Sequence, residues 1–409
     1  MDLSFSGFRA AHPPRVQIFV SDLSATGVVR NAIAIANQAA ASGFQVRLLT
    51  CHADGVLRDE VEPAVEVIAL LDARNRTGKR DTQLKRALIR YRQETRQWRP
   101  DIMLSAGNHG HLLSSFAWLG LPGIKVLRIS NDLGHGRARL SWFKRIRRAI
   151  KFRFMAGLAD RLILVSRSIE QHPMMAPHVK SGKALAIPNG VDVAEVRRMA
   201  AIPCPHPWLA DPRVPAVLAV GRPAPQKNFG TLIRALAEAR KERELRLVIL
   251  GGGDRADVAG IARLASQLGV RQHVDFVASV PNPFSYMAAA DVLALPSLWE
   301  GSSNVLLEAM ACGTPVVAAT SAGDARVVLD KGRFGLLVEP LDEEALASAL
   351  LHQTGERPIL PAKRARELDR GHALAAYMQL LNQLAGAPAR NAIGDVHVKP
   401  PRRKLAVAR

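Results

Sequence analysis

The segment DVLALPSLWEGSSNVLLEAMACGTPVVAAT, residues 291–320, decides the fold class. It contains an aliphatic run at 291–297, a turn of small polar residues, a helical pattern at 303–312 and a second aliphatic run at 315–320. Short, uninterrupted aliphatic runs are typical of strands in a parallel sheet, because both faces of such strands are buried. The segment therefore predicts a strand, a helix and a strand, which together make one βαβ unit.

The same alternation continues towards the N-terminus. It passes through VDFVASV (274–280) and AVLAVGR (216–222), and an earlier series extends from RVQIFVS (15–21) to ALAIPNGVD (184–192). Between the two series lies a proline-rich stretch, 202–216, which suits neither helix nor strand interiors and predicts a linker. We therefore expect an α/β fold with two doubly wound, Rossmann-like domains.

These patterns divide the chain into four parts. Residues 1–190 are expected to form the first domain and residues 191–373 the second. A helix predicted over 374–395 packs back on the first domain. The last stretch, 396–409, is a basic, proline-containing tail without periodicity.

Bulk composition limits the class of protein. A chain of 409 residues with 48% hydrophobic residues is long enough for two or three globular domains. Its three cysteines, an odd number without CxxC spacing, argue against a disulfide framework and a zinc site. The N-terminus lacks the apolar core of a signal peptide, and no stretch reaches the roughly 20 apolar residues of a membrane span. We expect a cytoplasmic protein, which can also lie on the inner face of the cytoplasmic membrane.

The positive charge is concentrated in the first half. Of the net charge of +20, residues 1–200 contribute most, with 31 Lys and Arg against 16 Asp and Glu. The densest stretch, 137–153, has eight basic residues and no acid. Trp142, Ile146 and Ile150 recur in it at four-residue spacing, which predicts an amphipathic helix. Three interpretations fit this helix: an ordinary basic surface helix, a contact with an anionic membrane, or a contact with nucleic acid.

Candidate ligand-binding residues follow two strands of the second domain. In such sheets, ligands bind at the carboxyl ends of the strands, where helix N-termini face outward. The turn after 216–222 carries Gly221, Arg222 and Lys227, and its two cations can hold a diphosphate. An alternative is that each cation pairs with a surface acid. A second candidate turn follows the strand predicted at 291–297.

That second turn places small residues before a helix. Gly301 and Ser302 to Asn304 lead into the helix, whose first amides favour an anion. Glu308 is expected one to two turns inside this helix, where a carboxylate can accept hydrogen bonds from vicinal hydroxyls. Alternatively, Ser302 and Ser303 only cap the helix, and Glu308 is solvated.

With these motifs in place, residues 216–340 resemble the C-terminal domain of the retaining glycosyltransferases of family 4. The resemblance implies the GT-B fold, in which two doubly wound, Rossmann-like domains face each other across a cleft. The resemblance rests on GRPAPQKNFG (221–230), on Glu300 and Glu308 with seven residues between them, and on GRFGLLVEP (332–340). It implies a nucleotide-diphosphate sugar donor, UDP- or GDP-linked, with no other cofactor and no metal ion. The resemblance assigns the diphosphate to Arg222 and Lys227, the donor sugar to Glu300, and the ribose to Glu308.

The remaining site residues also follow from this resemblance. Val277 lies where main chain holds the base, and the 301–305 turn, which ends at Val305, is expected to meet the sugar and the phosphates. PNGVD (188–192) is similar to the hinge-side segment. The predicted catalytic residues are Arg222, Lys227 and Glu300. The predicted substrate-binding residues are Gly27, Asn131, Asp132, Asn189, Gly221, Val277, Gly301, Ser302, Ser303, Asn304, Val305 and Glu308.

The first domain resembles the family less closely. Gly27 and Arg30 match the acceptor-side loop, but Thr26 stands where a double glycine is common. Many members carry a histidine after the strand equivalent to IKVLRIS (124–130), and here Ser130, Asn131 and Asp132 occupy that region. His109 and His111 follow an earlier strand. They either replace the family's histidine or serve packing and the helix terminus.

Three classes of function fit these observations. The first is a metal-independent, retaining glycosyltransferase of the hexosyltransferase type, acting in the synthesis of lipopolysaccharide, another cell-surface polysaccharide or a glycolipid. Its expected partners are a nucleotide sugar, a glycan or lipid-linked acceptor and an anionic membrane surface. The second is an inactive, glycosyltransferase-like scaffold. The third is a basic nucleic-acid-binding protein, motivated by the pI of about 10.8, although the chain has no recognisable nucleic-acid module.

Overall fold

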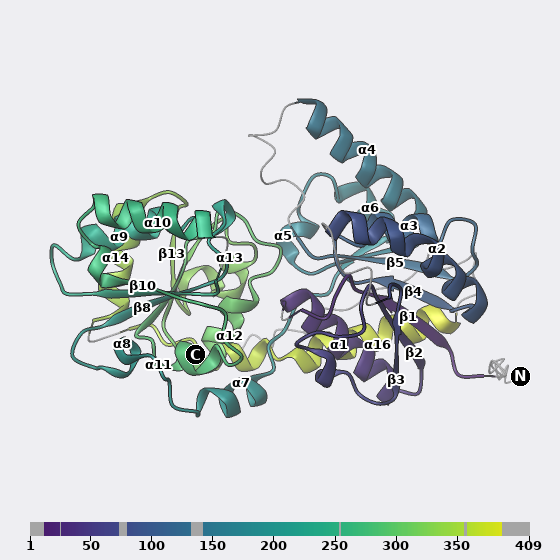
Figure 1. The fold of residues 1–409 in the computed structure, drawn as a ribbon, viewed down its shortest axis with the longest axis horizontal. Coiled ribbons are helices and arrows are strands. Elements are labelled where there is room, and N and C mark those ends of the chain that lie inside the picture. Colours follow the sequence, from purple (N-terminus) through teal and green to yellow (C-terminus); the bar gives the residue numbers. More distant parts are fainter. Residues whose placement is uncertain are drawn as a thin grey trace, which may run out of the picture.

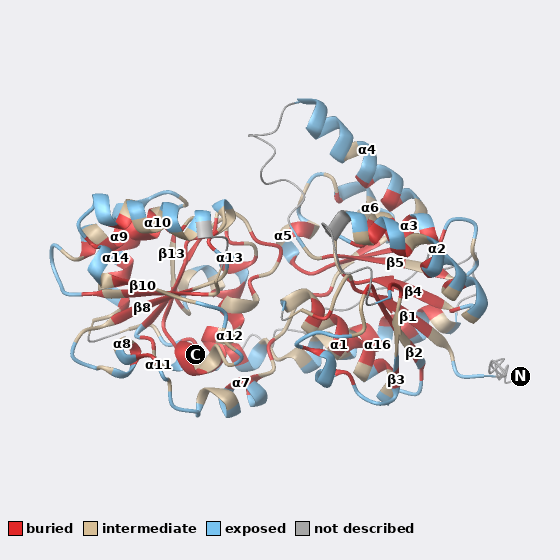
Figure 2. Ribbon diagram, in the orientation of Figure 1, coloured by how far each residue is buried: buried red, intermediate tan, exposed pale blue. Residues whose placement is uncertain are grey.

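The chain folds into two α/β units, each built on a parallel sheet (Figure 1). The structure is a computed structural model that describes residues 12–24, 26–72, 80–131, 142–252, 255–355 and 358–386. Within these residues one sheet has seven strands and the other six. Buried residues concentrate in the strands and on the inner sides of the helices (Figure 2). The predicted doubly wound α/β fold is confirmed.

The first sheet has the order β3-β2-β1-β4-β5-β6-β7. Its strands are β1 (Arg15–Phe19), β2 (Gln45–Thr50), β3 (Val65–Ala69), β4 (Ile102–Ser105), β5 (Ile124–Ile129), β6 (Arg161–Leu164) and β7 (Ala184–Ala186). Its helices are α1 (Gly27–Ala41), α2 (Arg80–Trp98), α3 (His111–Ala117), α4 (Trp142–Leu158), α5 (Arg167–Glu170) and α6 (Ala176–Lys180). The strand order reverses between β1 and β4, so a crevice opens at their carboxyl ends.

The second sheet has the order β10-β9-β8-β11-β12-β13. Its strands are β8 (Ala216–Val220), β9 (Arg246–Leu250), β10 (Val274–Val277), β11 (Val292–Leu295), β12 (Val316–Ala319) and β13 (Leu336–Val338). Its helices are α7 (Val193–Ala200), α8 (Pro207–Ala210), α9 (Phe229–Ala239), α10 (Arg255–Gln267), α11 (Phe284–Ala289), α12 (Asn304–Cys312), α13 (Ala325–Val328), α14 (Glu343–Gln353) and α15 (Ala362–Glu367). Here the order reverses between β8 and β11, and these strands end at the two candidate turns.

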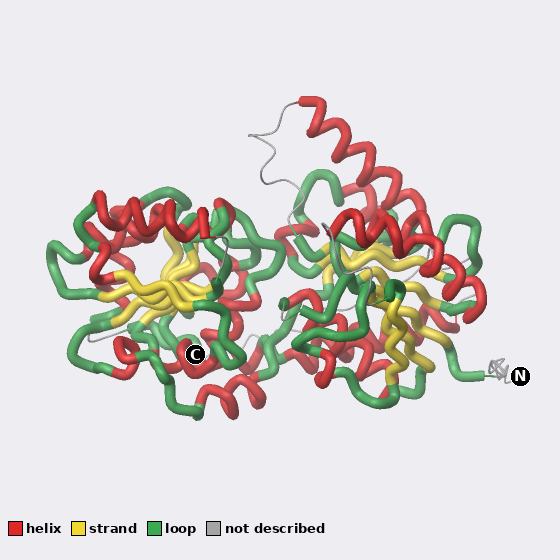
Figure 3. Tube along the Cα trace, in the orientation of Figure 1, coloured by secondary structure: helices red, strands yellow, loops and turns green. Residues whose placement is uncertain are grey.

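Alternate residues of each strand fill the layers on the two sides of a sheet. In β4, Ile102 and Leu104 belong to one buried cluster and Met103 to another. This explains the aliphatic runs, because strands covered on both faces need apolar side chains at every position. Figure 3 shows helices on both sides of each group of strands. No helix within the described ranges is both long and apolar enough to cross a membrane.

The last helix, α16 (Arg370–Gly386), returns to the first domain. It runs beside α1 (Figure 1), and its Tyr377, Leu380 and Leu381 belong to the same buried cluster as that helix. The chain thus crosses between the domains twice. The two crossings meet in an isolated β-bridge between Val191 and Asp369, where Arg370 N donates to Val191 O at 2.9 Å.

Several elements were not expected from the sequence, among them helix α2, strand β3 and the short helix α8 in the proline-rich linker. The basic segment predicted as a helix over 137–153 corresponds to α4, although residues 132–141 lie outside the described residues.

Candidate active site

The cationic turn after β8 is joined to the end of β11. Residues Pro225–Lys227 form a 3₁₀ turn, which ends at Asn228 in the left-handed region. Asn228 Nδ2 donates to Pro296 O at 3.2 Å. Lys227 Nζ lies 2.7 Å from Glu300 Oε1, so the two turns also share an ion pair. The pairing of Lys227 with an acid is therefore observed, and the acid is the predicted site residue Glu300.

Glu300 has three hydrogen-bond donors from the protein. Besides Lys227, Ser297 Oγ donates to Glu300 Oε1 at 2.9 Å, and Gln226 Nε2 donates to Oε2 at 3.1 Å. Both members of the ion pair are mostly buried, with side chains 18% and 11% exposed. The carboxylate therefore holds the lysine in a fixed position, and the ammonium keeps further N–H groups for a ligand.

Arg222 differs from Lys227 in having an exposed side chain. Its guanidinium forms no hydrogen bond or ion pair with any described residue, and Arg222 lines a cavity of about 240 Å³ together with residues of the first domain. Asn131, His109 and Asp22 line the same cavity. The structure thus brings predicted catalytic Arg222 and predicted substrate-binding Asn131 to one cleft. The predicted residue Asp132 lies outside the described residues.

The start of α12 has no side-chain cap. Ser303 is the N-cap residue, but its Oγ donates to Ala322 O at 3.2 Å instead of accepting from the helix. Side-chain capping by Ser303, one of the alternatives open from the sequence, is therefore wrong. Asn304 N donates to Ser302 O at 3.1 Å and Leu306 N to Ser303 O at 3.0 Å, whereas no described residue accepts from Val305 N. A free amide at a helix start attracts an anion. This turn holds five of the predicted residues, Gly301, Ser302, Ser303, Asn304 and Val305.

Two glycines allow the domains to approach each other closely. A Cβ on Gly301 would lie 2.2 Å from Ser130 O, and a Cβ on Gly27 would lie 1.9 Å from Asn304 Nδ2. Any side chain larger than hydrogen at Gly301 meets main chain of the other domain. Both predicted glycines therefore lie at the interface of the two domains.

Glu308 contrasts with Glu300 because no described residue gives it a hydrogen bond or an ion pair. It lines a cavity of about 440 Å³ with Gly27 and Arg30. Burial raises the pKa of the Glu308 carboxyl, and the charges of Arg30 and Lys227 oppose this rise. A carboxylate held in this way can accept hydrogen bonds from ligand hydroxyls.

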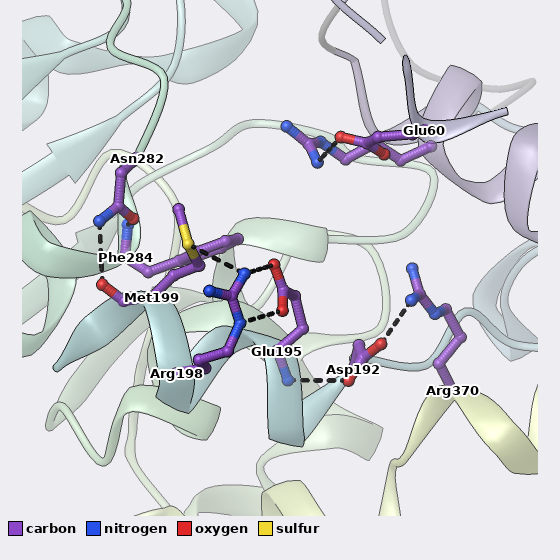
Figure 4. A network of polar contacts seen from close by, with 9 residues as sticks. Glu60, Asp192, Glu195, Arg198, Met199, Asn282, Phe284 and Arg370 are labelled. Atoms are coloured by element: carbon purple, nitrogen blue, oxygen red, sulfur yellow. Dashed lines mark hydrogen bonds and ion pairs between the residues drawn. The ribbon is translucent and has the colours of Figure 1, made fainter. Parts of the chain in front are cut away.

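The charged residues around that cavity are paired with each other, as Figure 4 shows. Arg370 Nη2 lies 2.6 Å from Asp192 Oδ2, and Arg198 Nη2 lies 2.8 Å from Glu195 Oε1. Glu60 pairs with Arg30 in the same way, so among the carboxylates of this cavity's described lining Glu308 is the one without a protein donor.

Val277 lines a third, mainly apolar cavity of about 310 Å³ at the ends of β9 and β10. Ile249, Phe276 and Val258 contribute to its wall. The carbonyl of Val277 accepts from the amides of Gly251 at 3.0 Å and Gly252 at 3.3 Å. An apolar slot of this size suits a planar base. The Val277 carbonyl, however, already accepts two hydrogen bonds from the protein.

The two histidines have different surroundings. His111 is buried, and its ring nitrogens lie 2.8 Å from Ser105 Oγ and 3.1 Å from Arg128 O. Burial lowers the pKa of His111 to about 3, so the ring is neutral. His111 therefore packs inside the domain. His109 is exposed and lines the cavity with Arg222.

Sequence reasoning missed a buried hydrogen-bond chain that joins the domains. Arg128 in β5 is 1% exposed; its Nε donates to Tyr377 Oη at 3.0 Å and its Nη2 to Asn189 Oδ1 at 2.7 Å. Asn189 Nδ2 in turn donates to Asn304 Oδ1 at 2.9 Å. The predicted residue Asn189 thus connects the first domain to the start of α12. A cation inside the aliphatic run IKVLRIS was the available signal.

Asp22 was also missed. It directly follows the strand predicted at 15–21, so the rule that ligands bind at strand ends would have found it. No group of three or more His, Cys, Asp or Glu side chains within the described residues is arranged to hold a metal ion.

Two doubly wound domains that face a cleft, with a cationic turn and an open helix start in the second domain, define the GT-B architecture. The solved structure of sucrose-phosphate synthase from Thermosynechococcus elongatus has the same fold. It is similar with a TM-score of 0.73 and 23% identity, over 92% of this chain and 100% of that chain.

Family models match both domains. The model described as Glycosyltransferase Family 4 matches residues 25–195, and the model described as Glycosyl transferases group 1 matches residues 214–354. The chain therefore belongs to the family 4 glycosyltransferases, and the resemblance stated from the sequence is confirmed.

Curated relatives match over shorter segments. The chain is 39% identical over 146 residues to the GDP-mannose-dependent alpha-(1-6)-phosphatidylinositol monomannoside mannosyltransferase of Mycolicibacterium smegmatis, covering 33% of this chain and 37% of the relative. It is 33% identical over 185 residues to the lipopolysaccharide core biosynthesis glycosyltransferase LpsE of Rhizobium meliloti, covering 45% and 49%. The matched segments thus span less than half the length of these relatives.

Proposed function

We propose that this chain is a retaining glycosyltransferase that moves a sugar from a UDP- or GDP-linked donor to a glycan or lipid-linked acceptor, without a bound metal ion. The observation that carries the proposal is the arrangement around α12. The Lys227–Glu300 ion pair and the uncapped helix start lie on adjoining turns, and Arg222 faces the first domain's cavity. The chemistry that this arrangement suits is the departure of a diphosphate.

A nucleoside diphosphate gains negative charge as its bond to the sugar breaks. The Lys227 ammonium, the Arg222 guanidinium and the Val305 amide at the start of α12 can all take up that charge. Fixed donors of this kind stabilise the transition state more than the ground state, because they need no rearrangement when the charge develops. Glu300 contributes by holding Lys227 in place.

The proposed transfer retains the anomeric configuration. The bond between the anomeric carbon and the phosphate oxygen breaks, the acceptor oxygen forms its bond on the same face, and the acceptor proton moves to the departing phosphate. No carboxylate nucleophile is then required. In this arrangement Glu308 accepts from the ribose hydroxyls and the cavity at Val277 receives the base.

The acceptor enters from the first domain in this proposal. Asp22, His109 and Asn131 line one cavity together with Arg222, and their polar side chains suit sugar hydroxyls. The two relatives support the acceptor class, since the name of one contains a phosphatidylinositol mannoside and that of the other lipopolysaccharide core. Synthesis of a cell-surface polysaccharide or glycolipid is the corresponding role.

Thermal shift with UDP-glucose, UDP-galactose, UDP-N-acetylglucosamine and GDP-mannose tests donor binding. A donor at 100 times its dissociation constant is expected to stabilise the chain by about 2.7 kcal/mol. Release of nucleoside diphosphate then measures turnover, with EDTA in one arm to test metal independence. NMR of the sugar product reports the anomeric configuration.

Arg222→Ala is the matched variant for this test, and Arg263→Ala, an exposed arginine of α10, is its control. Turnover is expected to fall in the first and to stay unchanged in the second. Donor binding without turnover would favour the inactive scaffold. DNA binding without any donor binding would favour the nucleic-acid protein.

A further inference from the structure

Helix α4 has apolar side chains on two opposite faces. Successive residues of a helix are rotated by about 100°, so Phe152, Met155 and Ala156 share one face. These three are buried in the first domain's core. This face accounts for the packing of α4 on the body of the protein.

The other face is apolar but exposed. Its side chains are between 37% and 67% exposed, and they are Trp142, Phe143, Ile146, Ile150 and Phe154. Figure 1 shows α4 leading away from the body of the first domain, and Figure 2 colours most of the helix as exposed. Single exposed apolar residues are common, but five on one helix face are typical of a surface that binds a partner.

The apolar face continues onto the neighbouring helix. Phe116 of α3 packs against Phe154 with 5.4 Å between ring centroids, and Phe116 itself is exposed. Leu119, just after α3, is exposed as well. The outer face is thus a patch formed by two helices of the first domain.

Cations surround this patch. Helix α4 contains six exposed basic residues and no acid, and they are Lys144, Arg145, Arg147, Arg148, Lys151 and Arg153. No described acidic residue forms an ion pair with any of them. By rotation along the helix, Arg153 lies among the apolar residues, Arg147 and Lys151 flank one side of them and Arg145 flanks the other. Lys144 and Arg148 lie towards the opposite face. The partner must therefore offer both apolar volume and negative charge.

We propose that the outer face of α4 docks on an anionic lipid bilayer, with its apolar side chains in the headgroup–acyl boundary and its cations against lipid phosphates. A helix that lies in the plane of an interface requires this combination. Nucleic acid would satisfy the cations but leave five apolar side chains exposed. A second copy of the chain would cover the apolar residues, but it would bring its own six cations against the six of the first copy.

Vesicle flotation of the full chain tests this proposal. The vesicles are phosphatidylcholine alone, or phosphatidylcholine with 30% phosphatidylglycerol. We expect at least tenfold stronger partition to the anionic vesicles, weakened by salt. Two triple variants, Trp142→Ser/Ile146→Ser/Ile150→Ser and Lys144→Gln/Arg147→Gln/Lys151→Gln, should each reduce partition at least tenfold.

Control variants carry the same kinds of change elsewhere on the surface. Val56→Ser/Leu360→Ser removes exposed apolar residues, and Lys363→Gln/Arg366→Gln removes exposed cations. Both should partition like the unaltered chain. Because all these side chains are exposed, the fold is expected to persist, and circular dichroism checks it.

Other outcomes would overturn the proposal. Equal partition to neutral and anionic vesicles would exclude anionic recognition. A dimer in light scattering that the apolar triple variant abolishes would identify a second copy as the partner, and tighter binding to DNA than to vesicles would identify nucleic acid. Donor-dependent thermal shifts in the triple variants report on the proposed activity separately.

Discussion

Replacement of Lys227 by methionine removes the ammonium and keeps an unbranched side chain against Gly221. In the structure, Lys227 Nζ donates to Glu300 Oε1 at 2.7 Å, and Ser297 and Gln226 donate to the same carboxylate. Two of the three donors on Glu300 therefore remain in the variant. We expect the turn to keep its conformation while losing its charge.

The cost to stability should be moderate and the cost to transfer large. Loss of one hydrogen bond to a charged, mostly buried group costs about 1.5–3 kcal/mol, and for a domain of this size each kcal/mol lowers Tm by about 2–4 °C. Removal of one preorganised donor from a developing anion typically costs about 10²–10³ in kcat. The loss in turnover thus exceeds what the loss in stability can explain.

The assay is nucleoside diphosphate release, measured well below the Tm of the variant. Lys241→Met is the matched control, because Lys241 Nζ also lies 2.6 Å from a glutamate, Glu238, but on the exposed surface. An exposed pair contributes about 0–1 kcal/mol, and this control should turn over normally. Turnover of Lys227→Met within threefold of the unaltered chain would refute the role of the ammonium.

Four further predictions follow from single residues of the site. Gly301→Ala, whose Cβ would meet the Ser130 carbonyl, should open the cleft in small-angle scattering and reduce turnover at least tenfold, whereas unchanged scattering would contradict the close approach. Arg128→Met should cost about 3 kcal/mol or more in urea unfolding, because it leaves buried acceptors unsatisfied, and a loss below about 1 kcal/mol would show that the chain of hydrogen bonds is weak. Glu308→Gln should weaken donor binding yet stabilise the free protein at pH 7. Burial raises the pKa of Glu308, so its ionised form opposes folding in the unaltered chain. The stability gained by the variant should vanish as the pH falls below the ordinary pKa of 4.5. His111→Gln should flatten the decline of Tm between pH 6.5 and 5, because a ring whose pKa is lowered to about 3 makes the folded state lose stability as the pH falls; an unchanged slope would exclude that origin.

The sheets and the cationic turn could be predicted from the sequence because their signals are local. Aliphatic runs mark strands buried on both faces; a glycine and two cations follow one of these runs, and a turn of small residues follows another. Edge strand β3 gave a weaker signal, since Glu66 faces solvent and pairs with Arg47. Helix α2 was concealed because most of its residues are polar, although Leu84, Ala87 and Tyr91 form a buried stripe at helical spacing.

Contacts between distant segments were not predictable in the same way. The chain from Tyr377 through Arg128 and Asn189 to Asn304 joins four separate parts of the sequence, and no spacing within one segment specifies it. The same holds for the approach of Gly301 to Ser130. Such contacts depend on how two domains pack, which the local pattern of either domain does not determine.

Glu300, in the turn, and Glu308, in the helix that follows it, have different surroundings in the folded chain. Spacing places Glu300 and Glu308 at the same end of the sheet but treats them alike. In the folded chain, Glu300 has three protein donors, whereas Glu308 has none among the described residues and burial raises its pKa. A carboxylate that is already satisfied orients its neighbours, so in the proposed reaction we expect Glu300 to act mainly through Lys227. A carboxylate whose pKa is raised by burial costs the free protein stability, and a ligand that donates hydroxyls to it recovers that cost. On the proposed function, we therefore expect Glu308 to couple donor binding to the stability of the fold.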